Sequence, residues 1–392
     1  MKKRVLIFCD FYPPAQGGGG MFAVVNIVDR FSDRYDFFVV AGNRIAFSDD
    51  ASISGLSLDV WQQNGNARVF YTPSLSLDSK KIGELIKTAT PDLIFLNSVF
   101  SRSTIFFLKA RRRGDLPSHP VIIAPCGELL PIALAQKALK KRVFLSYAKL
   151  SKLYDGLTWR ASFESERQAI AQFAGPNAEI VIAPDLTPAS ILPDFETLSK
   201  PPKSSGAAQF IFVARVVKLK NLHFLLECLQ EIIEGSVELS IVGPAQDLTY
   251  WAQCRRLIAT LPANIVVDVV GAVDRDRVLE LLVSSHYFVL PTLSENFGYV
   301  FLEALAAGCP LLISDRTDWE SVESAGAGWV NAPTDRASWI AAIRQCLDHD
   351  QEEYQKRSAA ARGFALDWLS DAGNEEATAH LFEFALGQHQ RV

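Results

Sequence analysis

The chain has 392 residues, of which 49% are hydrophobic and 21% are charged. This length exceeds one ordinary core, because domains typically contain about 100 to 200 residues, and the composition excludes a disordered chain. The formal net charge of −5 lacks the strongly basic balance of a nucleic-acid-binding protein, so we expect no nucleic acid among the partners.

Short apolar runs rich in β-branched and aromatic residues alternate with helical patterns along the whole chain. This alternation is typical of parallel sheets built from β-α-β units. In the first half we expect strands at 5–9, 37–41, 69–72, 93–96, 121–124, 157–161 and 180–183. In the second half we expect them at 210–214, 238–242, 265–270, 287–290, 311–314 and 329–331. The pattern predicts an α/β protein with two doubly wound units.

A proline-rich stretch separates the two halves. It carries four prolines after Leu186 and then Ser204, Ser205 and Gly206, a composition that interrupts the periodicity and marks a linker. The expected parts are an N-terminal Rossmann-like domain (1–186), a linker (187–208), a C-terminal Rossmann-like domain (209–369) and a C-terminal helix that packs back on the N-terminal domain (370–392).

Four glycines, Gly17 to Gly20, follow the first expected strand and precede a helix that should begin near Met21. Glycines at such a strand–loop–helix turn permit a close approach of the backbone to a ligand. The spacing disfavours a dinucleotide fingerprint, because Phe22 occupies the place of the third glycine. A plain flexible loop is the alternative.

Glu295 and Glu303 stand eight positions apart in a second strand–loop–helix turn. Gly298 would let backbone N–H groups at the start of the helix approach a diphosphate, which the positive helix end stabilises. Glu303 lies among apolar residues of that helix, so its carboxylate needs a partner, and two ribose hydroxyls would provide one. A local salt bridge of Glu303 and a solvated Glu295 are the alternatives.

Two cations, Arg215 and Lys220, follow the first strand of the same half. Arg215 offers a planar fork of donors and Lys220 a compact charge. Together they would neutralise a diphosphate and stabilise a leaving nucleoside diphosphate. Lys218, which lies between them, is expected to be solvated.

The run from 294 to 310 is similar to the E-x7-E stretch of retaining glycosyltransferase family 4. Members of this family have the GT-B fold, in which two Rossmann-like domains face an interdomain cleft. Arg215 and Lys220 match the cations that the family places on the donor diphosphate, although Ala214 and Asn221 stand where many members have glycine. The resemblance implies an acceptor-binding N-terminal domain, a donor-binding C-terminal domain and retention at the anomeric carbon.

The resemblance also implies roles for individual residues. Glu303 would bind the ribose and Glu295 the transferred sugar. The expected catalytic residues are Arg215, Lys220 and Glu295, and the expected donor-binding residues are Gly18, Gly19, Asn296, Phe297, Gly298, Tyr299, Val300 and Glu303. Cys126 departs from the family, in which a histidine is common at this place, so any role of that histidine does not transfer.

We expect no cofactor and no metal, with a nucleotide diphosphate sugar as co-substrate. The six histidines lack ligand spacing, and the triplets at 274–276 and 348–350 are expected to open and to close helices. The donor is expected to be a UDP-hexose, and the acceptor a glycan or lipid-linked sugar of cell-surface polysaccharide biosynthesis. The alternatives are a nucleotide-sugar 2-epimerase of GT-B fold and a non-catalytic nucleotide-sugar-binding protein.

Residues 137–152 contain six basic and no acidic side chains, with four apolar residues at helical spacing along the opposite face. This pattern predicts a peripheral contact with an anionic membrane or with a lipid diphosphate acceptor, and a solvated helix face is an equal alternative. The six scattered cysteines indicate a reducing compartment. We therefore expect a cytoplasmic protein at the inner face of the membrane.

Overall fold

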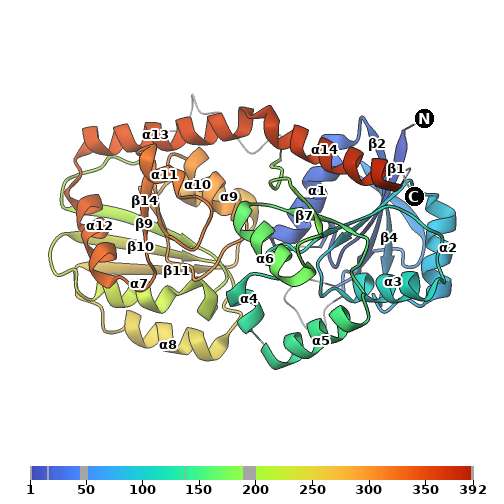
Figure 1. Ribbon diagram of the computed structural model, residues 1–392. Coiled ribbons are helices and arrows are strands. Elements are labelled where there is room, and N and C mark those ends of the chain that lie inside the picture. Colours follow the sequence, from blue (N-terminus) through green and yellow to red (C-terminus); the bar gives the residue numbers. More distant parts are fainter. Residues whose placement is uncertain (1, 16, 45–51, 137, 189–199, 390–392) are drawn as a thin grey trace. The chain divides into compact units, whose positions relative to one another are not determined.

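The computed structural model describes residues 2–15, 17–44, 52–136, 138–188 and 200–389. The chain divides into two compact units (Figure 1). The first unit comprises Met1–Pro188 and Ala372–Val392, and the second comprises Ala189–Asp371. Half of the expected linker, from 189 to 199, lies outside the described residues.

The first unit is built on an eight-stranded sheet in the order β3-β4-β2-β1-β5-β6-β7-β8. Its neighbouring strands are parallel except for β3 and β4, which pair antiparallel at one edge. The strands are β1 (Lys3–Phe8), β2 (Tyr35–Gly42), β3 (Trp61–Asn64), β4 (Ala67–Thr72), β5 (Leu93–Asn97), β6 (Val121–Ala124), β7 (Thr158–Ala161) and β8 (Glu179–Ile182). The strand order reverses between β1 and β5.

Helices cover both faces of this sheet because successive strand residues point to opposite sides. The helices are α1 (Gly19–Phe31), α2 (Ser79–Ala89), α3 (Arg102–Arg113), α4 (Pro131–Ala135), α5 (Ala138–Leu150), α6 (Glu164–Ala174) and α14 (Ala372–His389). Leu6 and Phe8 of β1 pack into the core under α2 and α3, whereas Val5 and Ile7 pack into the core under α1 and α14. The C-terminal helix is therefore part of the first unit.

The second unit has a six-stranded parallel sheet in the order β11-β10-β9-β12-β13-β14. The strands are β9 (Ala207–Val213), β10 (Ser236–Val242), β11 (Ile265–Gly271), β12 (Tyr287–Leu290), β13 (Leu311–Ser314) and β14 (Gly328–Asn331). This is the doubly wound order, and it reverses between β9 and β12. Ligands of open α/β sheets bind at the carboxyl ends of the strands beside such a switch point.

Helices flank the second sheet, with α7 and α8 on one side and α10 and α13 on the other (Figure 1). The helical elements are the 3-10 turn η1 (Lys218–Lys220), α7 (Leu222–Leu229), α8 (Leu248–Ile258), α9 (Arg275–Val283), α10 (Tyr299–Ala306), α11 (Ser321–Ser324), α12 (Arg336–Asp348) and α13 (Gln351–Ser370). Asp274 caps the start of α9 and Asp348 ends α12, as the sequence predicts. Asp350 does not close a helix but opens the next one, because its side chain accepts from Glu353 N at the start of α13.

The strand predictions agree with the observed strands to within a few residues, and the α/β fold class is confirmed. The polar strand β3 was not predicted. The second sheet also begins earlier than expected, because Ala207 of β9 falls within the expected linker. Just before it, Lys203 is buried and its ammonium donates to the carbonyls of Leu347 and His349.

Candidate functional site

Two loops meet at the switch point of the second unit. One follows β9 and carries Arg215 and Lys220, and the other follows β12 and carries Glu295. The Leu293 N–H donates to the Leu219 carbonyl at 2.8 Å, and the Thr292 hydroxyl donates to the same oxygen at 3.2 Å. The structure therefore brings Glu295 together with the two cations, of which Lys220 is 75 residues away in the sequence and Arg215 lies farther.

Lys220 and Glu295 form an ion pair between these loops. Their side chains are only 10% and 19% exposed, so each charge needs the other to offset its loss of hydration. Arg215 lies near the same carboxylate, and its guanidinium also donates to Gln246 Oε1 at 2.8 Å. Burial lowers the pKa of Arg215, and the neighbouring Glu295 opposes that shift. Lys218 is exposed, as predicted.

Local backbone chemistry explains how the first loop reaches this geometry. Asn221 adopts the left-handed conformation with φ 59°, which asparagine tolerates better than most residues. Gly243 ends the neighbouring strand β10 with φ 132°, and a Cβ there would lie 2.1 Å from the Ala214 carbonyl oxygen. The glycine at 243 thus leaves room for the start of the loop that carries Arg215 and Lys220.

The second loop ends at Gly298, which precedes α10 with φ 76°. A Cβ at this position would lie 2.6 Å from the Phe301 ring and 3.0 Å from Glu295 Cγ, so only glycine fits. No side chain caps the helix, and its first turn has no acidic residue. The start of α10 is therefore suited to an anion.

A cluster of aromatic side chains packs against this loop and holds it in place. Phe297 is buried, its ring contacts Tyr299 and Trp319, and its carbonyl accepts from Trp319 Nε1 at 2.5 Å. Asn296 and Val300 are half-buried on either side. Of these expected donor-binding residues, Phe297 has a clear structural role as the anchor of the loop.

Glu303 has a protein partner that the sequence reasoning did not supply. Arg275, the first residue of α9, donates from Nε to Glu303 Oε1 at 2.9 Å. Burial raises the pKa of Glu303, and Arg275 opposes the shift. The local salt bridge that was the alternative for Glu303 is therefore present, and its carboxylate does not depend on a ribose alone for a partner. Arg275 follows the carboxyl end of β11, and this position could have identified it as a residue of the site.

The glycine loop of the first unit lies at the corresponding switch point, between β1 and β5. Gly18 precedes α1 without a side-chain cap, and Gly18 and Gly19 are exposed. The Asn97 side chain, at the end of β5, donates to the Gly20 carbonyl at 2.9 Å and holds the loop in place. The structure thus places these two expected donor-binding glycines at a strand end, within their own unit.

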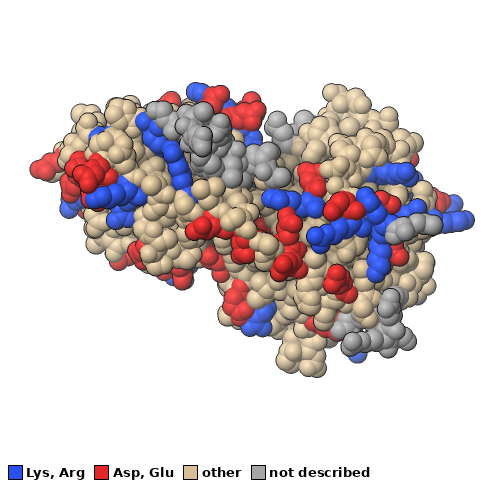
Figure 2. Space-filling model, turned by 90° about the horizontal axis from the view of Figure 1, so that it is seen from above, with Lys and Arg blue, Asp and Glu red and all other residues tan. Residues whose placement is uncertain are grey.

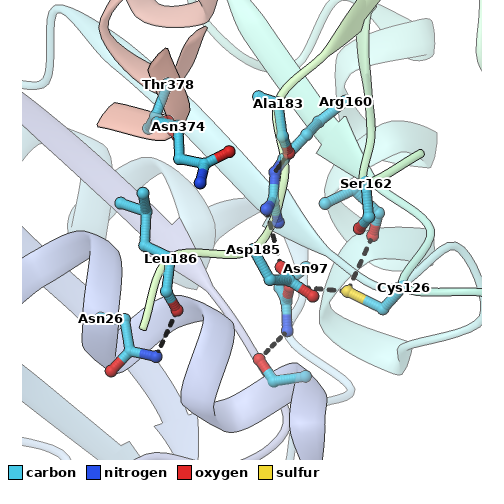
Figure 3. A network of polar contacts seen from close by, with 12 residues as sticks. Asn26, Asn97, Cys126, Arg160, Ser162, Ala183, Asp185, Leu186, Asn374 and Thr378 are labelled. Carbon is cyan, nitrogen blue, oxygen red and sulfur yellow. Dashed lines mark hydrogen bonds and ion pairs between the residues drawn. The ribbon is translucent and has the colours of Figure 1, made fainter. Parts of the chain in front are cut away.

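A polar network surrounds Cys126 beside this loop (Figure 3). The Cys126 Sγ lies 3.2 Å from Asn97 Oδ1, and burial raises the pKa of the thiol, so it is protonated at neutral pH. Arg160 and Asp185 form a fully buried ion pair at 2.7 Å behind it. The thiol therefore acts as a small packed group.

Glu128 ties the end of β5 to the loop after β6. Its carboxylate accepts from the Ser98 hydroxyl at 2.8 Å and from the Val99 and Phe100 N–H groups at 2.8 and 3.3 Å. Burial nevertheless raises the pKa of Glu128 to about 7. Ser98 has φ 91°, a strained value for a residue other than glycine, and the bonds to Glu128 hold it there.

Within the described ranges there is no group of three or more His, Cys, Asp or Glu side chains that could hold a metal ion. Among the same residues, no helix is long and apolar enough to cross a membrane. A hollow of about 800 Å³ lies in the first unit at the starts of β6, β7 and β8, away from the strand ends that carry the glycine loop.

Two parallel-sheet α/β units of this kind define the GT-B fold. The structure of Anabaena Alr3699/HepE in complex with UDP and glucose aligns with 97% of this chain and 99% of its own, with a TM-score of 0.71 and 16% identity. WaaG, a glycosyltransferase involved in lipopolysaccharide biosynthesis, aligns with 95% of this chain and 98% of its own, with a TM-score of 0.65 and 14% identity. At these identities the likeness shows the fold alone.

Sequence similarity to known proteins covers part of the chain. Residues 194–364 match the family described as "Glycosyl transferases group 1". The glycogen synthase of Mycobacterium tuberculosis is 31% identical over 253 residues, which are 62% of this chain and 58% of that protein. The chain thus spans somewhat more than half the length of this curated relative. The family match includes every candidate residue of the second unit.

Proposed function

We propose that the chain is a retaining glycosyltransferase that moves a hexose from a nucleotide diphosphate sugar, a UDP-hexose, to a glycan or lipid-linked acceptor. The observation that carries this proposal is the cluster of Arg215, Lys220 and Glu295 beside the uncapped start of α10. It lies at the switch point of a doubly wound sheet, where such folds bind their ligands. The family match over the same residues supports it.

In this proposal the two cations stabilise the leaving group. The donor diphosphate lies between Arg215, Lys220 and the N–H groups that follow Gly298, and negative charge that develops on the departing nucleoside diphosphate is stabilised there. Lys220 already has a fixed position because it is paired with Glu295, so little reorganisation is needed. No metal and no cofactor takes part.

Glu295 and Glu303 have different tasks. Glu295 lies next to the two cations and accepts hydrogen bonds from the hexose. Glu303 accepts from the ribose hydroxyls, and Arg275 holds its carboxylate in one orientation and favours its charged form. Arg275 is thus a positioning residue rather than a group that touches the donor.

The two alternatives predict different products. A 2-epimerase would isomerise the sugar without an acceptor, and a binding protein would turn over nothing. The gathered cations suit a reaction in which negative charge develops on a diphosphate leaving group. We place the reaction in the cytoplasm, in the assembly of cell-surface polysaccharide, and the six free cysteines agree with a reducing compartment.

The test is a reaction with UDP-hexoses in the presence and absence of oligosaccharide and polyprenyl-linked sugar acceptors. Release of UDP that depends on the acceptor is expected, and nuclear magnetic resonance of the product should show the donor's anomeric configuration. An isomerised sugar nucleotide without acceptor would assign the chain to the epimerases. Inverted product would contradict the retaining mechanism.

A further inference from the structure

Helix α5 has apolar side chains on two opposite faces. The side that faces the core of the first unit carries Phe144, Leu145 and Ala148. The other side carries Leu139, Val143, Tyr147 and Leu150, which are 78%, 63%, 47% and 86% exposed. At about 100° per residue, these four side chains cluster roughly half a turn away from the core face. A surface helix normally places polar residues there.

The four exposed side chains form a continuous row and not a scatter. Positions 139, 143, 147 and 150 are spaced by three or four residues, so each is the neighbour of the next on the helix surface. Scattered single apolar residues on a surface need no explanation, but a row does. We call this row the exposed face of α5.

Basic side chains border the exposed face on both sides. Lys140 lies on one side of the row, Arg142 and Lys149 lie on the other, and all three are exposed. Lys141 is different: it turns toward the core, donates to the Ala133 carbonyl at 2.6 Å and lies 4.9 Å from the centre of the Phe100 ring. The described helix has no acidic side chain.

The helix is held firmly to the first unit at its end. Arg111 at the end of α3 donates to the carbonyls of Asp155 and Gly156 at 2.9 and 3.1 Å. Arg112 donates to the Ser151 carbonyl at 3.1 Å. The segment after α5 is thus fixed to α3, and the exposed face is presented by a rigid element rather than by a loose loop.

We propose that the exposed face of α5 docks on an anionic lipid surface. The apolar row would enter the boundary between headgroups and acyl chains, and Lys140 and Arg142 would lie at the level of the lipid phosphates. Charge favours this occupant over a protein partner, because every charged side chain of the described helix is basic. On the face of the molecule drawn in Figure 2, acidic and basic side chains are interspersed.

The inference does not depend on the donor site, so either can fail alone. Binding of the full chain is measured by co-sedimentation with vesicles of phosphatidylcholine and with vesicles that also contain phosphatidylglycerol. We expect binding only when phosphatidylglycerol is present. The double variant Lys140→Gln/Arg142→Gln should bind about 30-fold more weakly, at about fivefold for each lost charge. The double variant Leu139→Ser/Val143→Ser should lose at least about tenfold.

Matched controls lie on α8 of the second unit. Leu248→Ser removes a leucine that is 73% exposed, and Arg255→Gln/Arg256→Gln removes two exposed cations. Both controls should bind as the wild type does, and thermal unfolding should show that all variants fold. The proposal is overturned if the wild-type chain binds both kinds of vesicle equally well, or if it binds neither. So does a dimer that Leu139→Ser/Val143→Ser converts to a monomer, because the row would then belong to a second copy.

Discussion

Replacement of Lys220 by alanine tests the proposed leaving-group site most sharply. The substitution removes a cation that is paired across two loops, and it leaves the Glu295 carboxylate in a place where its side chain is only 19% exposed. The negative charge of that carboxylate would then repel the donor diphosphate more strongly. Both effects oppose the build-up of negative charge on the leaving group.

The size of the effect follows from the geometry of charges. Two unit charges about 4 Å apart interact with about 4 kcal/mol at an effective dielectric constant of about 20. Solvent and the remaining Arg215 offset part of this loss, so we take about 2.7 kcal/mol as the lower figure, which is about 100-fold in rate. The release of UDP by Lys220→Ala should fall by at least that factor.

The control for this variant is Lys218→Ala. Lys218 belongs to the same 3-10 turn and is exposed, so its loss should leave the rate near that of the wild type. Initial rates of UDP release are measured for both variants at a temperature below their unfolding midpoints. Wild-type activity of Lys220→Ala would refute the reasoning, as would an equal loss in the two variants.

Three further predictions concern a glycine of the candidate site and two buried carboxyl groups of the first unit. Gly298→Ala should lower transfer at least about tenfold, because its Cβ would collide with the Phe301 ring, and initial rates measure this. The pKa of about 7 for Glu128 is above its usual value, so its contribution to stability is present below about pH 4.5 and is lost as the pH rises through 7. The unfolding midpoint of the wild type should therefore fall relative to Glu128→Gln between pH 5 and 8. Asp185→Asn should lower the free energy of unfolding by about 3 to 5 kcal/mol in denaturant titrations, because it leaves Arg160 buried without its ion pair.

Each of these has a result that would count against it. Full activity of Gly298→Ala would mean that the loop can shift without consequence. A constant difference between wild type and Glu128→Gln across the pH range would show that the carboxyl does not titrate there. An Asp185→Asn variant with unchanged stability would mean that solvent reaches Arg160.

The sequence predicted the sheets well because parallel strands buried on both faces are short, continuous apolar runs. The run from 287 to 290 is such a case, and its predicted limits are those of β12. Strand β3 was missed because Trp-Gln-Gln-Asn has a single apolar residue, Trp61, and one residue makes no alternating pattern. Trp61 packs against Phe38 and Phe70, which lie far from it in the sequence or on the neighbouring strand.

The candidate site was predicted in part. Arg215, Lys220 and Glu295 could be grouped in advance because their loops follow predicted strands of one doubly wound unit and the family resemblance assigns them to one donor. Arg275 and Trp319 could not, because a side chain's partner depends on the rotation of its helix or loop, which periodicity does not fix. The pairing of Glu303 with Arg275 shows how a buried carboxylate can be satisfied by a residue of the preceding helix.

The account's central claim is that the second unit binds a nucleotide diphosphate sugar at the start of α10. A thermal-shift titration of the full chain with UDP-hexoses and other nucleotide sugars tests it directly. At about 100 times its dissociation constant, a bound donor adds about 2.7 kcal/mol of stability and raises the unfolding midpoint, and this rise should shrink in Lys220→Ala but not in Lys218→Ala. The claim is contradicted if no nucleotide sugar shifts the midpoint, or if the shift is the same in both variants.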